Sequence, residues 1–217
     1  GDGSPASPAA LSLGVPGVND APVAQAGAFT VAEGAPVLSG QVTATDVDAG
    51  AVLGFTLDGA APAGLVFNAD GRYSFDAGHA AYQSLAVGQS TVLTVPYTVT
   101  DEHGATSRAD LVITVTGTND APMAAADLAS TPINTALANI VVLANDSDVD
   151  GDALSVTGAS LLNPALGSVS VNPDGTLNFT PAANITGRVA ISYTVADGQG
   201  GTATARLTVN VGANPPP

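Results

Sequence analysis

The feature of this chain that most constrains its fold is an internal repeat with a period of about 100 residues. Four short segments of the first half return in the same order in the second half. The matching pairs are residues 18–24 with 118–124, 45–48 with 147–150, 68–71 with 172–175, and 97–101 with 193–197. The chain is therefore expected to fold as two copies of one unit, each near the lower size limit for a single hydrophobic core.

The boundary between the two units is expected at residues 119–122, where the second copy of the Asn-Asp-Ala-Pro sequence lies. On this division, residues 18–120 form the first repeat and residues 121–217 form the second. Residues 1–17 are rich in Gly, Pro, Ser and Ala, and they are either a linker or the end of a preceding repeat.

Apolar residues in both units alternate with a period of two, which is the pattern of a half-buried strand. The clearest sets are Leu93, Val95, Tyr97 and Val99 in the first unit, and Val189, Ile191, Tyr193 and Val195 in the second. The pairs Asp70-Gly71 and Asp174-Gly175 lie between short β-prone runs and are expected to form hairpin turns of the primed type. No helical stripe persists over three turns, so we predict an all-β fold with about seven strands per unit in a Greek-key sandwich.

The charge balance excludes some partners. The chain has 19 acidic and 4 basic residues and a net charge of −15, so it would be repelled by the phosphates of nucleic acids. No apolar run is long enough to cross a membrane, and no membrane insertion is expected. The chain has no Cys and only 2 His, so carboxylates are the only plentiful metal ligands.

The acidic residues gather in short clusters with Asn and Gly, and the densest cluster is residues 146–152. This cluster resembles the start of an EF-hand loop, but Thr157 stands at the twelfth position, where a bidentate Glu is required, and the flanks are β-like. Closely spaced carboxylates repel one another at neutral pH unless a cation lies among them. The alternative, a solvated acidic loop, stays open.

The sequence does not favour an enzyme. His79 and His103 are not accompanied by a nucleophile motif or a phosphate-binding loop. A glycosidase needs a cleft with two matched carboxylates, usually lined with aromatic side chains, and the chain has no Trp and 4 Tyr. We therefore expect no catalytic residues.

Several segments resemble a known family. Residues 112–122 resemble the last strand and interdomain linker of cadherin repeats, and more closely those of the VCBS and cadherin-like repeats of large bacterial adhesins of the RTX type. Residues 71–76 followed by 81–85 resemble the centre of a VCBS repeat, and residues 142–152 are similar to the bacterial cadherin-like repeat that often alternates with it. The resemblance covers about residues 18–212, and it implies two tandem cadherin-like (Ig-like) Greek-key β-sandwich domains.

In cadherin-type repeats calcium lies at the junction between domains, so the resemblance implies Ca²⁺ sites here. The central junction would use Glu33, Asp76, Asn119, Asp120, Asp148, Asp150 and Asp197. A second site, at the N-terminal end of the first unit, would use Asn19, Asp20, Asp46, Asp48 and Asp101, and is expected to be incomplete because its upstream donors are missing.

Three points about these sites stay open. Asp146 and Asp152 either enlarge the central site or face water. The far end of the second unit departs from the pattern, because residues 131–134 contain no acid to match Glu33, and Thr180 stands where Asp76 would match. A calcium site at that end is therefore in doubt.

The resemblance implies a calcium-binding extender or stalk module of an adhesin on the bacterial cell surface, with calcium rigidifying the interdomain junction. Its partners would be the neighbouring repeats of the same chain. Two other classes remain open: a module that binds a carbohydrate or protein directly, and a module for calcium-dependent homophilic association in a biofilm.

Overall fold

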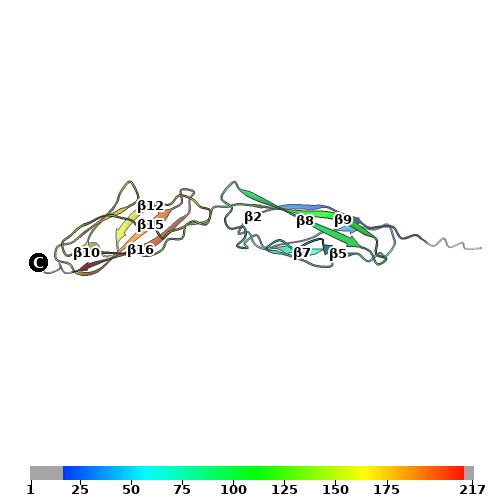
Figure 1. The fold of residues 1–217 in the computed structure, drawn as a ribbon, viewed down its shortest axis with the longest axis horizontal. Helices are drawn as coiled ribbons and strands as arrows, with labels where there is room; N and C mark the ends of the chain where they lie inside the picture. The colour runs from blue at the N-terminus through cyan, green and yellow to red at the C-terminus, as the bar shows by residue number, and fades with distance from the viewer. Residues whose placement is uncertain (1–16, 213–217) are drawn as a thin grey trace, which may run out of the picture.

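The structure is a computed structural model and describes residues 17–212. It contains two β-sandwich domains that lie end to end along the long axis of the molecule (Figure 1). They are joined by one extended segment, residues 117–122, called the joining segment below. The prediction for residues 1–17 falls outside the described residues except at Gly17. No helix in the described part of the chain is long and apolar enough to span a membrane.

The first domain packs a four-stranded sheet against a three-stranded sheet. The larger sheet has the order β2 (Gly27–Ala32), β9 (Thr106–Thr116), β8 (Ser90–Thr100) and β5 (Gly54–Leu57). The smaller sheet has the order β3 (Leu38–Gln41), β7 (Arg72–Phe75) and β6 (Leu65–Phe67). A short pair, β1 (Val23–Ala24) with β4 (Ala44–Thr45), completes the end of the domain that faces the N-terminus.

The second domain repeats this arrangement. Its larger sheet has the order β10 (Asp127–Pro132), β16 (Thr202–Gly212), β15 (Gly187–Ala196) and β12 (Ser155–Leu161), and its smaller sheet β11 (Leu137–Ile140), β14 (Leu177–Pro181) and β13 (Gly167–Val171). One 3₁₀ turn, Pro164–Leu166, precedes β13. A single bridge between Met123 and Ser147 replaces the β1–β4 pair. The predicted all-β fold with seven main strands per unit is confirmed.

In each domain the first long strand runs parallel to the last one, and this pairing decides what lies at the end of the sandwich. β2 and β9 end together, with Ala32 opposite Thr116. The residue that follows β2 is Glu33. Its carboxylate therefore lies at the point where the chain leaves the first domain. β10 ends at Pro132, and the residue in the equivalent place is therefore Ile133.

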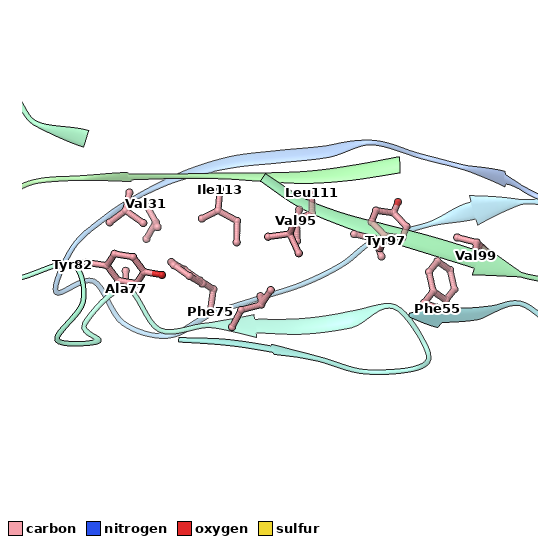
Figure 2. Packing of buried hydrophobic residues seen from close by; sticks show 13 residues of the cluster. Val31, Phe55, Phe75, Ala77, Tyr82, Val95, Tyr97, Val99, Leu111 and Ile113 are labelled. Carbon is pink, nitrogen blue, oxygen red and sulfur yellow. The ribbon is translucent and has the colours of Figure 1, made fainter. Parts of the chain in front are cut away.

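The cores follow the predicted alternation. Val95, Tyr97 and Val99 of β8 are buried against Leu111 and Ile113 of β9, and Figure 2 shows these side chains pointing into the space between the two sheets. The second domain buries the corresponding residues, namely Val189, Ile191, Tyr193, Val195, Leu207, Val209 and Val211. Burial of these alternating side chains fixes the register of each strand, because a shift by one residue would turn the apolar set outward.

The hairpins at the Asp-Gly pairs form as predicted, but their turn type differs. The amide of Gly71 donates to the carbonyl of Asn68 at 3.0 Å, and the amide of Asn68 donates to the carbonyl of Arg72 at 2.9 Å. Only the glycine of the pair has positive φ, +79°. A primed two-residue turn needs positive φ at both central residues, so this is a longer turn that ends in a glycine bulge. The turn at Gly175 repeats these bonds.

Candidate metal centre at the domain junction

Glu33 brings the first domain's carboxylate to the junction. Glu33 is 4% exposed. The backbone amide of Thr118, in the segment that joins the domains, donates to Oε1 of Glu33 at 2.6 Å. The other oxygen, Oε2, is buried and has no hydrogen-bond partner among the described residues. A buried carboxylate oxygen without a donor is costly unless a cation lies beside it.

The joining segment binds the second domain through its Asn-Asp pair. The side-chain amide of Asn119 donates to Oδ2 of Asp197 at 2.9 Å, and the backbone amide of Asp120 donates to Oδ2 of Asp150 at 2.8 Å. These bonds use the donors of the segment and leave its acceptors free. Oδ1 of Asn119 and Oδ2 of Asp120 are both buried without a partner.

Asp148, Asp150 and Asp152 lie on one loop of the second domain. The backbone of this loop turns around the carboxylate of Asp148. Oδ1 of Asp148 accepts the backbone amides of Asp150 at 2.9 Å and of Asp152 at 3.5 Å. This is the local side chain to backbone bonding by which Asp favours turns. It leaves Oδ2 of Asp148 and Oδ1 of Asp150 buried without a partner.

Asp197 is held by the hairpin between β15 and β16. Its Oδ1 accepts the backbone amides of Gln199, Gly200 and Gly201 at 2.7, 3.0 and 3.0 Å. The hydrogen bond from Asn119 lowers the pKa of the Asp197 carboxyl, as do these three amides. Asp197 therefore remains an anion and fixes Asn119 at the junction.

The three segments bring their oxygens into two overlapping groups. Oxygens of Glu33, Asp120 and Asp150 all lie within 4.8 Å of one another, and so do oxygens of Asp148, Asp150 and Asp152. Asp150 belongs to both groups. The unpartnered buried oxygens at the junction are Oε2 of Glu33, Oδ1 of Asn119, Oδ2 of Asp120, Oδ2 of Asp148 and Oδ1 of Asp150.

This donor set fits a hard cation, because every free atom is an oxygen and four of the five belong to carboxylates. The electrostatics agree with that reading. Desolvation, together with the charges of Asp150 and Asp148, raises the pKa of the Asp120 carboxyl. Desolvation and the neighbouring aspartates also raise the pKa of Asp152. Like charges are thus crowded together, and a bound cation would relieve their repulsion.

Three acids differ from what the resemblance implies: Asp76 and Asp197 join neither group of close oxygens among the described residues, and Asp152, which the sequence left open, joins one. Oδ1 of Asp76 accepts the amide of Gly78 at 2.9 Å. Asp146 accepts the amide of Ala125 at 2.7 Å and belongs to neither group. The spacing of Asp148, Asp150 and Asp152, two residues apart, was the signal that could have identified Asp152.

The N-terminal end of the first domain repeats half of this arrangement. The side-chain amide of Asn19 donates to Oδ2 of Asp101 at 2.9 Å, and the amide of Asp20 donates to Oδ2 of Asp48 at 2.8 Å. Oδ1 of Asp46 accepts the amide of Asp48 at 2.9 Å. Within residues 17–212, no three acids bring their oxygens together at this end.

The far end of the second domain is built from amides instead of acids. Ile133 and Thr180 occupy the places of Glu33 and Asp76, as the strand registers show. Beside them, the backbone amide of Asn184 donates to Oδ1 of Asn134 at 2.7 Å, and the side-chain amide of Asn134 donates back at 3.2 Å. This pair of neutral side chains offers a cation no carboxylate.

Two family models match the chain. Residues 19–117 match the bacterial cadherin-like domain, and residues 119–210 match the bacterial Ig domain. The chain therefore carries two cadherin-like, Ig-like β-sandwich domains, as predicted, while the narrower assignment to VCBS repeats of RTX adhesins stays a prediction. No curated protein matches the sequence.

Solved cadherin structures share the fold. Human CDH23 EC21-23 is 14% identical, with a TM-score of 0.53 over 88% of this chain and 69% of that one. Mouse cadherin-23 EC22-24 is 19% identical, with a TM-score of 0.52 over 89% of this chain and 65% of that one. The protocadherin GammaB4 extracellular domain is 21% identical, with a TM-score of 0.49 over 89% of this chain, but this chain spans only 35% of its length. At these identities, the likeness to the two cadherin-23 structures shows the fold alone.

Proposed function

We propose that this chain, with its bacterial cadherin-like and bacterial Ig domains, is a calcium-binding extender module of an adhesin on the bacterial cell surface. The observation that carries the proposal is the meeting of Glu33, Asp120 and Asp150 within 4.8 Å. These three carboxylates come from the first domain, the joining segment and the second domain. A cation bound among them would hold all three parts together.

The ligands expected to hold Ca²⁺ are the carboxylates of Glu33, Asp120, Asp148 and Asp150 and the side-chain oxygen of Asn119. Calcium takes six to eight oxygen ligands in flexible geometry, which suits carboxylates that come from different segments. Soft or borderline metals prefer thiolate and imidazole, and the chain has no Cys. Asp197 supports the site by fixing Asn119, and Asp152 extends it next to Asp148 and Asp150.

The stabilisation expected from each ion is modest, but it acts at a hinge. Extracellular calcium modules bind with a Kd of about 10⁻⁴ to 10⁻³ M, so about 1 mM calcium would stabilise a site by roughly 0.4 to 1.4 kcal/mol. Removing the ion also restores the repulsion among the junction carboxylates. Calcium would thus convert a loose joint into a stiff one and hold the two domains extended.

A calcium-dependent joint suits a repeat protein that carries a distal binding tip away from the cell. In repeat arrays each unit contacts only its neighbours, so the stiffness of each junction sets the shape of the whole filament. The partners of this chain would be the neighbouring repeats, and the chain would lie outside the cell.

Isothermal calcium titration of the chelator-treated chain tests this function. We expect saturable binding in the wild type and loss of the stronger binding phase in Asp148→Ala with Asp150→Ala. The matched control is Asp46→Ala with Asp48→Ala, the equivalent pair at the N-terminal end, which should keep that phase. Absence of binding in the wild type, or the same loss in both double variants, would contradict a calcium site at the central junction.

A further inference from the structure

The start of the joining segment is fixed to the first domain by three consecutive residues. The carbonyl of Thr116 accepts the amide of Glu33 at 2.9 Å, and the amide of Gly117 donates to the carbonyl of Gln89 at 2.9 Å. The amide of Thr118 then donates to Oε1 of Glu33 at 2.6 Å. The direction in which the chain leaves the first domain is therefore set before it reaches the ligands.

At Gly117 the joining segment passes very close to the backbone of another loop of the first domain. A β-carbon at Gly117 would overlap the carbonyl oxygens of Leu85 and Ala86 and lie 2.6 Å from the carbonyl carbon of Leu85. The φ of Gly117 is not positive, so what the position requires is space. Any side chain would force either the loop that contains Leu85 or the joining segment to move.

The loop is anchored in the core of the first domain through Tyr82. It spans residues 76–89 between β7 and β8, and its Tyr82 is 4% exposed. The hydroxyl of Tyr82 donates to the carbonyl of Ala63 at 2.6 Å, and its ring lies 5.6 Å from that of Phe75. Figure 2 shows Tyr82 at the end of the core, beside Ala77 and Val31. Moving this loop would disturb the core, so the joining segment is the part that would yield.

In the described part of the second domain, the equivalent loop is much shorter. The connection between β14 and β15 is only residues 182–186, against residues 76–89 in the first domain. The residue that follows β16 in the sequence is Ala213, where Gly117 follows β9. Within residues 17–212, the long loop and the glycine thus occur together in the first domain, where Glu33 follows β2.

We propose that Gly117 is a positioning residue for cation binding at the central junction. By letting the joining segment lie against the carbonyls of Leu85 and Ala86, it places Thr118 on Glu33 and sets Asn119 and Asp120 toward the second domain. Gly117 offers no ligand of its own and acts only through the path of the backbone. This inference rests on the proposed function.

The test is Gly117→Ala in the full chain, with Gly59→Ala as the matched control, because a β-carbon at Gly59 meets no atom within 4 Å. We expect Gly117→Ala to weaken calcium binding in titration by about tenfold or more, the range seen when residues behind metal ligands are changed. The melting temperature of the first domain in chelator should stay near the wild-type value. The NMR amide signal of Thr118 in chelator should also shift, since its bond to Glu33 would lengthen. Gly59→Ala should match the wild type in all three measurements.

Wild-type calcium affinity in Gly117→Ala would overturn the inference. Unfolding of the first domain in chelator would overturn it too, because Gly117 would then serve the sandwich and not the joining segment. If the wild type itself bound no calcium, the proposed function would fail. The Thr118 signal would still report separately whether Gly117 sets the path of the backbone.

Discussion

At the scale of single residues, the carboxylates of Glu33, Asp148 and Asp150 are held in place by main-chain amides and not by basic side chains. The ion pairs among the described residues involve Arg72, His103 and Arg108, and none of them lies at the junction. Amide donors orient a carboxylate without cancelling its charge. The negative charge of Glu33, Asp120 and Asp150 therefore remains available to a cation.

Glu33→Gln tests this reading, because it removes one charge and keeps the shape of the side chain and an oxygen for the Thr118 amide. We expect calcium affinity to fall by about tenfold or more, while the melting temperature in chelator stays equal or rises, since repulsion with Asp120 and Asp150 is relieved. Calcium titration and thermal unfolding measure the two effects. Asp110→Asn, at an exposed acid on β9, is the control. Unchanged affinity in Glu33→Gln would remove Glu33 from the site.

At the scale of elements, the strands could be predicted from the sequence because burial imposes a period of two on β8, β9, β15 and β16. The turn type at Gly71 could not, since a dipeptide does not show how many residues the hydrogen bonds enclose. The meeting of Glu33 with Asp120 and Asp150 was implied by resemblance alone. It depends on the parallel pairing of β2 with β9, which residue spacing along one chain does not reveal.

The loops that converge at the junction predict a pH dependence of calcium binding. The pKa of Asp120 is raised above its ordinary value of 3.8 by desolvation, Asp150 and Asp148, and that of Asp152 is raised as well. Protons should therefore compete with calcium at a pH above the range of an ordinary Asp, so affinity should fall as the pH is lowered toward these raised pKa values. Calcium titrations from about pH 7 to pH 4.5 measure this effect. A flat affinity over that range would contradict the crowding of these carboxylates.

In chelator, the free energy of unfolding should first rise and then fall as the pH is lowered. Protonation of Asp120, as the pH falls through its raised pKa, relieves repulsion and stabilises the folded chain. Asp197 has a lowered pKa, so its contribution is complete above the ordinary value of 3.8 and is lost as the pH falls through the folded-state pKa. The melting temperature in chelator should thus pass through a maximum on the acid side before it declines.

At the scale of the whole molecule, the two domains share one fold but differ at their far ends. The first ends in Glu33 and a long loop, and the second ends in Ile133 and the Asn134–Asn184 pair. Among the described residues, the far end of the second domain brings no group of three acids together as the central junction does. A bound cation would therefore stiffen the joint between the two domains without a matching site at that far end. On the proposed function, the extension of the chain would depend on calcium at the central junction.

Small-angle X-ray scattering of the full chain, with calcium and with chelator, measures that dependence most directly. We predict a larger radius of gyration and maximum dimension with calcium, and a smaller, more heterogeneous particle in chelator. Asp148→Ala with Asp150→Ala should resemble the chelated wild type under both conditions. Identical dimensions of the wild type with calcium and with chelator, at concentrations where titration shows the site saturated, would contradict a calcium-stiffened junction.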